Sequence, residues 1–307
     1  MTKDANAVVG SEIAKVGDVE VAYDVRGEGE PLLLVPGFSM TRVMWDDDFC
    51  DRLVRHGFKV VRMDNRDTGA SSRVDHLGVP NIPRMFVRSV LGLPLRPGYT
   101  LEDMARDATG LMTHLGHARF HVAGTSMGGM IAQTLAIHHP ARLASLTSIM
   151  STPGGRRYSF ASPRALRALL QRLPSQPEAQ VEHFVGLFRL IGGDAVVIDE
   201  ARSRRVAESL VESGPSASGS ARQFAAILES AGRRRPHLRA LRMPTLVVHG
   251  SRDPLLPVRG ARAMARLVPG AELLIVDGMG HIIPSASYGL VTDAIARNAK
   301  RAAPLHG

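Results

Sequence analysis

Short apolar runs rich in Val, Leu and Ile recur along the chain, and helix-length amphipathic stretches lie between most of them. The seven runs cover residues 19–25, 31–37, 58–64, 120–124, 143–150, 245–250 and 272–278. The first run alternates apolar and polar residues, as an edge antiparallel strand does. The later runs are nearly continuous, which is typical of strands buried on both faces of a parallel sheet. The pattern predicts an α/β fold with a mostly parallel, doubly wound sheet.

One predicted helix carries sequence signals at both of its ends. Thr100 is the expected N-cap, Asp103 takes the third helical position of a capping box, and Gly116 is expected to end the helix. The apolar stripe between them consists of Leu101, Met104, Ala108, Leu111 and Met112. This helix leads directly into the apolar run at 120–124, so the pattern predicts a helix followed at once by a strand.

The strand pattern stops between residues 151 and 241, where helical segments are broken by prolines. We therefore predict a first part of the core domain at 1–150, a helical cap insertion at 151–241 and a second part of the core at 242–307. The segment at 213–221, SGPSASGSA, has the composition of a loop. A shorter stretch at 74–98 is rich in Pro and Gly, and we expect it to be irregular and to fold against the same face.

The composition fits a folded domain rather than a disordered or nucleic-acid-binding chain. A chain of 307 residues that is 44% hydrophobic and 22% charged can bury a large core. The formal net charge of +9 is compatible with an anionic partner, so the distribution of the charge matters. Only four of the 38 basic residues are lysines, the arginines are scattered, and no nucleic-acid-binding motif accompanies them. We predict a solvated basic surface and no nucleic-acid partner.

Cysteine content and hydropathy give expectations about location. Cys50 is the only cysteine, so no intramolecular disulfide can form, and we expect it to be a packed apolar residue. The first residues lack an apolar run of signal-peptide length, and no window approaches the ~18 uninterrupted apolar residues of a membrane span. We expect a cytoplasmic protein without a membrane span, and the sequence leaves the oligomeric state open.

The most informative motif is a serine between small residues. The stretch from Gly124 to Gly128, Gly-Thr-Ser-Met-Gly, matches the GxSxG pattern and lies between a predicted strand and a predicted helix. In that context a tight turn exposes the Ser126 hydroxyl, and the free N–H groups at the helix start can stabilise an oxyanion. The alternative is a glycine turn that serves close packing alone.

A serine hydroxyl is a weak nucleophile unless a base takes its proton, so a histidine and an orienting acid are required. Asp253 and His281 follow the last two apolar runs, in the order Ser, acid, His. Asp253 has an alternative role as an Asx turn or helix cap, and His281 has one as a structural histidine. His249 is better explained as a packing and hydrogen-bonding residue.

Other polar clusters are weaker candidates for chemistry. His114, His117 and His121 have a spacing that could suggest a metal site, but Gly116 interrupts the helix and puts the third histidine in a strand. We therefore predict no metal site. The three aspartates at 46–48 are expected to be first-turn charges that favour a helix N-terminus.

An oxyanion needs a second donor besides the Met127 N–H. The loop "VPGFSM" follows the first buried run, and Gly37 permits a tight turn that directs the Phe38 N–H towards the serine. The alternative is an ordinary turn between strand and loop. The nearby stretch at 64–72, DNRDTGASS, is assigned a structural role.

Together these motifs resemble the α/β-hydrolase superfamily, in the esterase and lipase-like branch that includes aclacinomycin methylesterase-type enzymes. VPGFSM, DNRDTGASS, GTSMGG, HGSRDPLLP and GMGH occur in the family order. The resemblance implies that Ser126 attacks a carbonyl, His281 shuttles the proton, Asp253 orients the histidine, and no cofactor is needed. It also implies Phe38 and Met127 as backbone donors. Many members have His-Gly where this chain has Pro-Gly at 36–37.

The same resemblance implies a cap that encloses a mostly apolar substrate pocket. From the core side we expect Gly37, Met40 and Trp45 to contact the substrate, with Phe38 and Met127 beside them. The expected function is hydrolysis of carboxylic esters of small to medium, largely apolar substrates through an acyl-enzyme. Alternatives on the same residues are a lactonase, thioesterase, perhydrolase or C–C bond hydrolase. A non-catalytic ligand-binding receptor of the same fold is the alternative from another class.

Overall fold

The computed structural model describes residues 11–158, 162–169, 171–193 and 199–304, so the expectation for the first residues concerns a segment largely outside the described part. The described chain is built on an eight-stranded sheet in the order β1-β2-β4-β3-β5-β6-β7-β8. The strands are β1 (Glu12–Val16), β2 (Val19–Arg26), β3 (Glu30–Val35), β4 (Phe58–Met63), β5 (Phe120–Thr125), β6 (Leu143–Ile149), β7 (Thr245–Gly250) and β8 (Glu272–Val276).

The sheet is parallel except for the pairings of β2 with β1 and with β4. β1 pairs antiparallel with β2, β2 pairs antiparallel with β4, and all other neighbours are parallel. β3 lies between β4 and β5, with Val35 beside Gly124, so the chain changes its direction of growth there. Loops after the strands on either side of such a point meet in one crevice, which is where α/β proteins place their ligands. The predicted doubly wound, mostly parallel sheet is confirmed.

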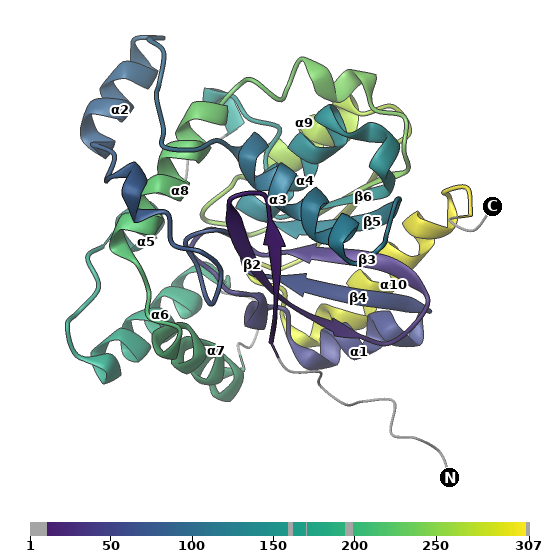
Figure 1. The fold of residues 1–307 in the computed structure, drawn as a ribbon, viewed down its shortest axis with the longest axis horizontal. Helices are drawn as coiled ribbons and strands as arrows, with labels where there is room; N and C mark the ends of the chain where they lie inside the picture. Colours follow the sequence, from purple (N-terminus) through teal and green to yellow (C-terminus); the bar gives the residue numbers. More distant parts are fainter. Residues whose placement is uncertain (1–10, 159–161, 170, 194–198, 305–307) are drawn as a thin grey trace.

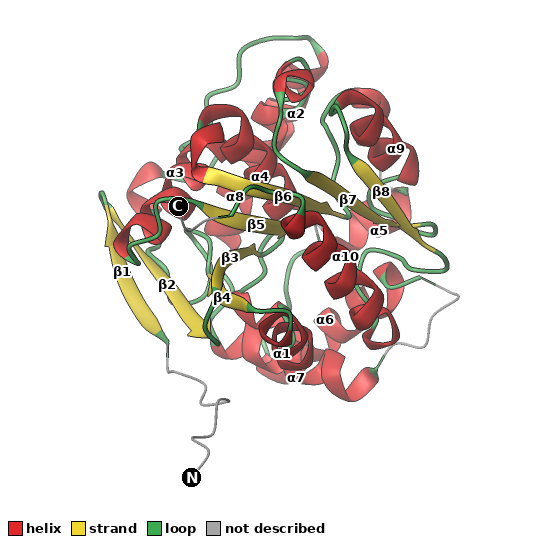
Figure 2. Ribbon diagram, turned by 90° about the vertical axis from the view of Figure 1, so that its right-hand side faces the viewer, coloured by secondary structure: helices red, strands yellow, loops and turns green. Residues whose placement is uncertain are grey.

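Helices cover both faces of the sheet (Figure 2). One face carries α3 (Leu101–His114), α4 (Met127–His138) and α9 (Val258–Leu267), and an apolar core fills the space beneath them. The other face carries α1 (Asp47–Arg55) and α10 (Tyr288–Lys300), with a second apolar core. The central strands from β3 to β7 are therefore buried between two helix layers, which is why their sequences are nearly continuous runs of apolar residues.

Four helices lie between β6 and β7, beyond the carboxyl ends of the parallel strands (Figure 1). They are α5 (Pro163–Leu169), α6 (Pro177–Ile191), α7 (Glu200–Glu212) and α8 (Ala217–Ser230). A third apolar cluster joins α5, α6 and α7 to one another. A further helix, α2 (Ile82–Val90), packs against α8. The short 3-10 helices are η1 (Arg42–Met44), η2 (Asp75–Leu77), η3 (Pro140–Arg142), η4 (Arg156–Tyr158), η5 (His237–Ala240) and η6 (Ser285–Ser287).

The expected capping box is present at the start of α3. The Thr100 hydroxyl accepts from the Asp103 N–H at 3.2 Å, and the Asp103 carboxylate accepts from the Thr100 N–H at 2.7 Å. Both interactions are local in sequence, so they form wherever the segment becomes helical. The aspartates at 46–48 also lie where expected, with Asp46 as the N-cap of α1 and the next two residues in its first turn.

The edges of the sheet differ from the expectation. The run at 19–25 was expected to be an edge strand, but β1 pairs with its outer side and takes the edge. β1 is short and mostly exposed, so its sequence carries little apolar signal. β8 was expected to be buried on both faces, yet it closes the opposite edge and is largely exposed. An edge strand has a neighbouring strand on one side only, and the sequence does not reveal which strand takes that position.

Two segments expected to be irregular contain helices. The stretch at 74–98 holds η2 and α2, and the Asn81 side chain caps α2 by accepting from the Arg84 N–H at 3.0 Å. The loop-like segment at 213–221 runs into α8, because the Ser216 hydroxyl accepts from the Gly219 N–H at 2.9 Å and starts the helix. Serine and asparagine favour helix caps as well as loops, so composition alone misassigns such segments.

Candidate active site

Ser126 occupies the turn between β5 and α4, with a positive φ of 53°. The flanking glycines make this turn possible. A Cβ on Gly124 would lie 2.2 Å from the Gly128 oxygen, and a Cβ on Gly128 would lie 2.2 Å from the Val35 oxygen. The glycines therefore allow strand and helix to approach closely while the serine holds a conformation that L residues rarely adopt. The turn stores strain at the residue that carries the hydroxyl.

The structure brings the three side chains singled out from the sequence into one hydrogen-bonded chain. His281 Nε2 lies 2.9 Å from Ser126 Oγ, and His281 Nδ1 lies 2.7 Å from Asp253 Oδ2. A carboxylate accepts hydrogen bonds only, so Nδ1 carries the proton and Nε2 is left free to accept the proton of the serine hydroxyl. Asp253 follows β7 and His281 follows β8, so neighbouring strand ends deliver both residues.

The side chain of Asp253 is completely buried and remains charged. Burial acts to raise its pKa, but the positive charge of a protonated His281 and hydrogen bonds from His249 and His281 outweigh that effect, so the pKa lies well below its usual range. Its second oxygen accepts the N–H groups of Leu255 at 2.8 Å and Leu256 at 2.9 Å. The carboxylate thus forms the Asx turn that was the alternative role of Asp253, and it binds His281 at the same time.

His249 contacts the same carboxylate oxygen of Asp253 as His281 does. Its Nε2 lies 2.8 Å from the Leu256 oxygen and 3.2 Å from Asp253 Oδ2. Both partners accept, so Nε2 carries a proton. Nδ1 is buried and has no hydrogen-bond partner among the described residues. The sequence predicted a hydrogen-bonding histidine here but not its contact with Asp253. The four-residue spacing of the two in HGSRD was the available signal.

The loop after β3 lies directly against the serine turn. A Cβ on Gly37 would lie 3.5 Å from the Cβ of Ser126. The Met40 N–H donates to the Gly37 oxygen at 3.3 Å, and Ser39 has a φ of 54°, so a tight turn forms as expected. Met127 is the first residue of α4, where helix N–H groups have no partner within the helix. The use of the Phe38 and Met127 N–H groups as oxyanion donors stays a prediction.

The stretch at 64–72 has the structural role assigned to it. Asp64 is buried and binds the main chain and guanidinium of Arg42. Asp67 is buried as well, accepts from the Tyr99 hydroxyl at 2.8 Å and pairs with Arg222 of α8. Burial raises the pKa of Asp67, but hydrogen bonds from Arg222, Val74 and Tyr99 bring it below its usual value. This loop therefore ties α8 to the sheet.

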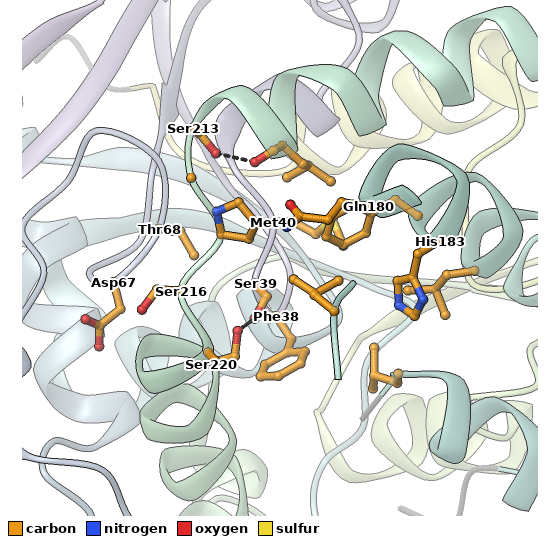
Figure 3. A pocket seen from close by; sticks show the side chains of 18 of the residues that line it. Phe38, Ser39, Met40, Asp67, Thr68, Gln180, His183, Ser213, Ser216 and Ser220 are labelled. Atoms are coloured by element: carbon orange, nitrogen blue, oxygen red, sulfur yellow. Dashed lines mark hydrogen bonds between the residues drawn. The ribbon is translucent and has the colours of Figure 1, made fainter. Parts of the chain in front are cut away.

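A cavity of about 730 Å³ lies between the loop after β3 and the inserted helices (Figure 3). Its apolar lining includes Phe38, Met40, Leu187 and Phe224. Its polar lining includes Ser39, Thr68, Gln180, His183, Ser216 and Ser220. The lining includes Phe38 but neither Ser126 nor His281, so the cavity is bounded by the loop after β3 and lies under α6 and α8.

Of the residues expected at the pocket, Phe38 and Met40 line this cavity, whereas Gly37, Trp45 and Met127 do not. Trp45 is 2% exposed, and its ring packs 5.6 Å from that of Phe49 in the core beneath α1. The Met127 side chain is fully buried in the core beneath α4. Aromatic and Met side chains suit a core as well as a pocket, and their spacing does not distinguish the two.

The remaining candidates for chemistry have structural partners. His121 Nδ1 lies 2.8 Å from the Ser145 hydroxyl, and Nε2 lies 3.2 Å from Glu30. Across the described ranges no group of three or more His, Cys, Asp or Glu side chains is arranged to hold a metal ion. Cys50 is buried as expected, and burial raises the pKa of its thiol to about 12, so it is a poor nucleophile.

A sequence profile of the alpha/beta hydrolase fold matches residues 30–285. The chain belongs to this family, in which the carboxyl ends of the strands carry the functional loops. In the described part of the chain, no helix combines the length and apolar character needed to cross a bilayer.

Relatives of known activity include methyl ester hydrolases. Rhodomycin D methylesterase of Streptomyces peucetius is 28% identical over 292 residues, which cover 89% of this chain and 91% of the relative. Pimeloyl-[acyl-carrier protein] methyl ester esterase of Vibrio vulnificus is 24% identical, covering 85% of this chain and 91% of the relative.

Solved structures superpose over almost the whole chain. A thermophilic esterase of Thermogutta terrifontis has a TM-score of 0.67 and 25% identity, covering 97% of this chain and 100% of the esterase. The meta-cleavage product hydrolase of Pseudomonas fluorescens IP01 has a TM-score of 0.74 and 18% identity, covering 96% of this chain and 98% of the hydrolase. The second likeness is evidence of the fold alone.

Proposed function

We propose that this protein hydrolyses carboxylic esters through an acyl-enzyme formed on Ser126. The observation that carries the proposal is the chain of contacts from Ser126 Oγ to His281 Nε2 at 2.9 Å and from His281 Nδ1 to Asp253 Oδ2 at 2.7 Å. The esterases among the relatives support the same reaction class.

The geometry supports a two-step mechanism. Ser126 Oγ attacks the ester carbonyl while His281 Nε2 takes its proton, and the buried carboxylate of Asp253 stabilises the resulting imidazolium. The oxyanion of the tetrahedral intermediate binds the N–H groups of Phe38 and Met127. His281 returns the proton to the leaving alcohol, which breaks the ester bond. Water then attacks the acyl-enzyme by the same route and releases the acid.

The cavity supports a substrate of small to medium size that is largely apolar. We propose that the larger part of the ester occupies the space of about 730 Å³ under α6 and α8, with Phe38 and Met40 on the core side. Residues 151–241 then act as a cap that limits access of water. The proposal requires no cofactor and no metal ion, and it retains the cytoplasmic location expected from the sequence.

The proposal is tested with p-nitrophenyl butyrate and a fluorophosphonate probe. We expect the parent protein to hydrolyse the ester and to be labelled at Ser126. Ser126→Ala should lose roughly 10³-fold or more in kcat and all labelling. Equal hydrolysis by parent and variant would reject the assignment. A parent that is neither active nor labelled would favour the ligand-binding alternative.

A substrate panel separates the reactions that share this chemistry. The lactonase, thioesterase, perhydrolase and C–C bond hydrolase alternatives all use a serine and a histidine base. We expect methyl and ethyl esters of apolar acids to give a higher kcat/KM than lactones or thioesters. A higher value for another class would move the assignment to that class while the nucleophile stays the same.

A further inference from the structure

The cap helix α8 reaches the loop that carries the proposed oxyanion donor. The Ser39 N–H donates to Gln223 Oε1 at 2.9 Å, and Gln223 Nε2 donates to the Arg66 oxygen at 2.9 Å. Ser39 Oγ lies 2.6 Å from Ser220 Oγ, and the two hydroxyls face each other beside the cavity (Figure 3). The Gln223 side chain is fully buried, so water does not compete for either partner.

Only an amide satisfies both partners of Gln223. One partner is a main-chain N–H, which must donate, and the other is a main-chain oxygen, which must accept. The orientation of the amide is therefore unambiguous. A carboxylate keeps the bond from Ser39 but cannot donate to Arg66, and a thioether of similar length makes neither bond. Leaving a buried N–H without a partner is costly, so the loop would have to move.

The bond holds the one peptide of this turn that is prone to rotate. The turn runs from Gly37 to Met40, and Ser39 at its third position has a φ of 54° while Phe38 does not have a positive φ. These signs match a type II turn, in which Gly or Asn is favoured at the third position. Rotation of the peptide between the second and third residues converts it to type I. The Ser39 N–H belongs to that peptide, so Gln223 opposes the rotation. The Phe38 N–H belongs to the preceding peptide, between Gly37 and Phe38, and Gln223 acts on it only indirectly, by fixing the neighbouring peptide that shares the Phe38 Cα.

Buried ion pairs fix the position of α8 itself. The Arg222 guanidinium, fully buried, binds both oxygens of Asp67 at 2.8 and 2.7 Å and also contacts Asp75 at 2.8 Å. Phe224 lies two residues further along α8. Its ring makes a T-shaped contact with the ring of Phe38, with 6.0 Å between the ring centroids. Neighbouring residues of α8 therefore contact both the loop after β3, which carries the proposed oxyanion donor, and the loop after β4.

We propose that Gln223 is a positioning residue that holds the Phe38 N–H in line with the oxyanion. The inference rests on the proposed function, because it concerns the transition state of ester hydrolysis. It extends the active site into the cap: α8 is a fixed part of the site rather than a lid that moves in each turnover.

The test compares Gln223→Met and Gln223→Glu with the parent. We expect Gln223→Met to lose about 10- to 100-fold in kcat with little change in KM. The substitution would displace the Phe38 N–H, and an oxyanion donor stabilises the transition state rather than the bound substrate. The inhibition constant of a trifluoromethyl ketone, which forms a tetrahedral adduct with the serine, should rise by a matching factor. Gln223→Glu keeps the acceptor for Ser39 and should recover part of the loss.

Asn298→Leu is the matched control for the loss of a buried amide. Asn298 lies on α10, is fully buried and donates to the Leu146 oxygen of β6 at 3.1 Å. We expect it to lower Tm but to leave kcat and the inhibition constant unchanged. A Gln223→Met variant with the kcat and inhibition constant of the parent would overturn the inference. Absence of labelling and activity in the parent would instead defeat the proposed function.

An independent observation concerns the surface around α2, which projects from the body of the protein beside α8 (Figure 1). Of the eleven exposed large hydrophobic residues in the described ranges, seven lie between positions 77 and 93. They include Val79, Phe86 and Leu91, which are 68%, 56% and 66% exposed. Such a concentration of exposed apolar residues on one helix and its flanks indicates an interaction surface.

The charges around this surface favour an anionic partner. Between Asp75 and Glu102 the chain has no acidic residue but has Arg84, Arg88 and Arg96. A two-fold contact with a second copy would bring the same patch against itself, so these arginines would face one another. An amphipathic helix with apolar and arginine side chains is suited to lie in the interface of a bilayer.

We propose that α2 and its flanks, residues 77–93, bind the surface of an anionic lipid bilayer. Ile82, the first residue of α2, also lines the cavity, so this orientation brings the cavity near a source of apolar esters. The binding does not depend on the proposed hydrolysis.

Vesicle sedimentation tests this second inference. We expect the full chain to sediment at low salt with vesicles of phosphatidylglycerol and phosphatidylcholine but not with phosphatidylcholine alone. The double variant Phe86→Ser/Leu91→Ser should weaken the partitioning at least about 10-fold, because the free energy gained by burying these two apolar side chains in the bilayer is lost. Leu290→Ser, which changes an exposed leucine on α10, is the control and should bind as the parent does. Absence of binding, or equal binding by both variants, would overturn the inference, and so would a dimer that only the double variant disrupts.

Discussion

The inserted helices hold two loops of the proposed active site by different means. At the loop after β3, which carries the proposed oxyanion donor, α8 uses side chains: Gln223 binds the Ser39 N–H, and Arg222 anchors the helix on Asp67. At the histidine loop, the end of α6 uses main chain: the His281 N–H donates to the Ile191 oxygen at 2.6 Å, and the Gly280 N–H donates to the Gly192 oxygen at 2.9 Å.

The difference decides how each loop can be perturbed. Side-chain bonds depend on residue identity, so a single substitution removes them. Main-chain bonds survive most substitutions and are broken only when added atoms push the two segments apart. Gly280 is the residue where this can happen, because a Cβ there would lie 2.3 Å from the Ile191 oxygen.

The largest expected effect is on the histidine side, where main chain holds the loop but Asp253 orients the ring. Asp253→Asn keeps the shape of the side chain, but its amide N–H₂ group can donate to His281 Nδ1. That bond favours the tautomer in which Nε2 carries the proton, so Nε2 cannot accept the proton of Ser126. We expect kcat to fall by roughly 10⁴-fold while near-UV circular dichroism stays that of the parent. A loss below about tenfold would show that the main chain alone orients the histidine.

The next largest effect tests the anchor of α8. Arg222→Met leaves the buried carboxylate of Asp67 without its main partner, and we expect a loss of about 3 kcal/mol in the free energy of unfolding, measured with urea. Arg204→Met is the control, since Arg204 pairs with Glu182 on the exposed surface of the cap and should leave the urea midpoint unchanged. Equal midpoints for the two variants would mean that α8 is not held by this pair.

Gly280→Ala is the substitution that perturbs the main-chain contact. The added methyl group forces the histidine loop away from α6, and we expect about a 10²-fold loss in kcat/KM, because small displacements of a catalytic group are costly. Gly186→Ala is the control: it lies on the exposed side of α6, and a Cβ there meets nothing within 4 Å. That variant should be active and slightly stabilised. If Gly280→Ala were as active as Gly186→Ala, the end of α6 would have no part in placing the histidine.

The smallest effect concerns pH. The pKa of Asp253 is lowered in the folded protein, so its contribution to stability is present above the unfolded value of about 3.9 and is lost as pH falls through the folded value. Asp253 therefore keeps its charge above about pH 4. We expect no loss of kcat/KM that is due to protonation of Asp253 in that range, so the acidic side of the profile should have a slope no steeper than one. A slope of two above about pH 4 would show that the carboxylate gains a proton there.

Local sequence signals predicted much of the frame. The capping box at Thr100 and the glycines around Ser126 act within a few residues, so they specify geometry wherever they occur. The order of Ser126, Asp253 and His281 after β5, β7 and β8 was also readable, because parallel strands place their carboxyl ends along one edge of the sheet. The distances among the three side chains then followed from the fold.

Contacts over long sequence separations were not readable. Trp45 lies in the core rather than at the cavity, and β1 rather than the first apolar run forms the edge of the sheet. Ser216 starts a helix inside a segment with the composition of a loop. In each case the residue type suits two environments equally well, and packing against distant segments selects one of them.

The sequence by itself determined the α/β pattern, the strained serine turn and the set of polar side chains that follow the strands. Only the tertiary structure decided that Gln223 meets Ser39, 184 residues away, and that the end of α6 meets the loop of His281. The physical reason is that turns and caps depend on nearby residues, whereas these bonds depend on where packing places a whole helix.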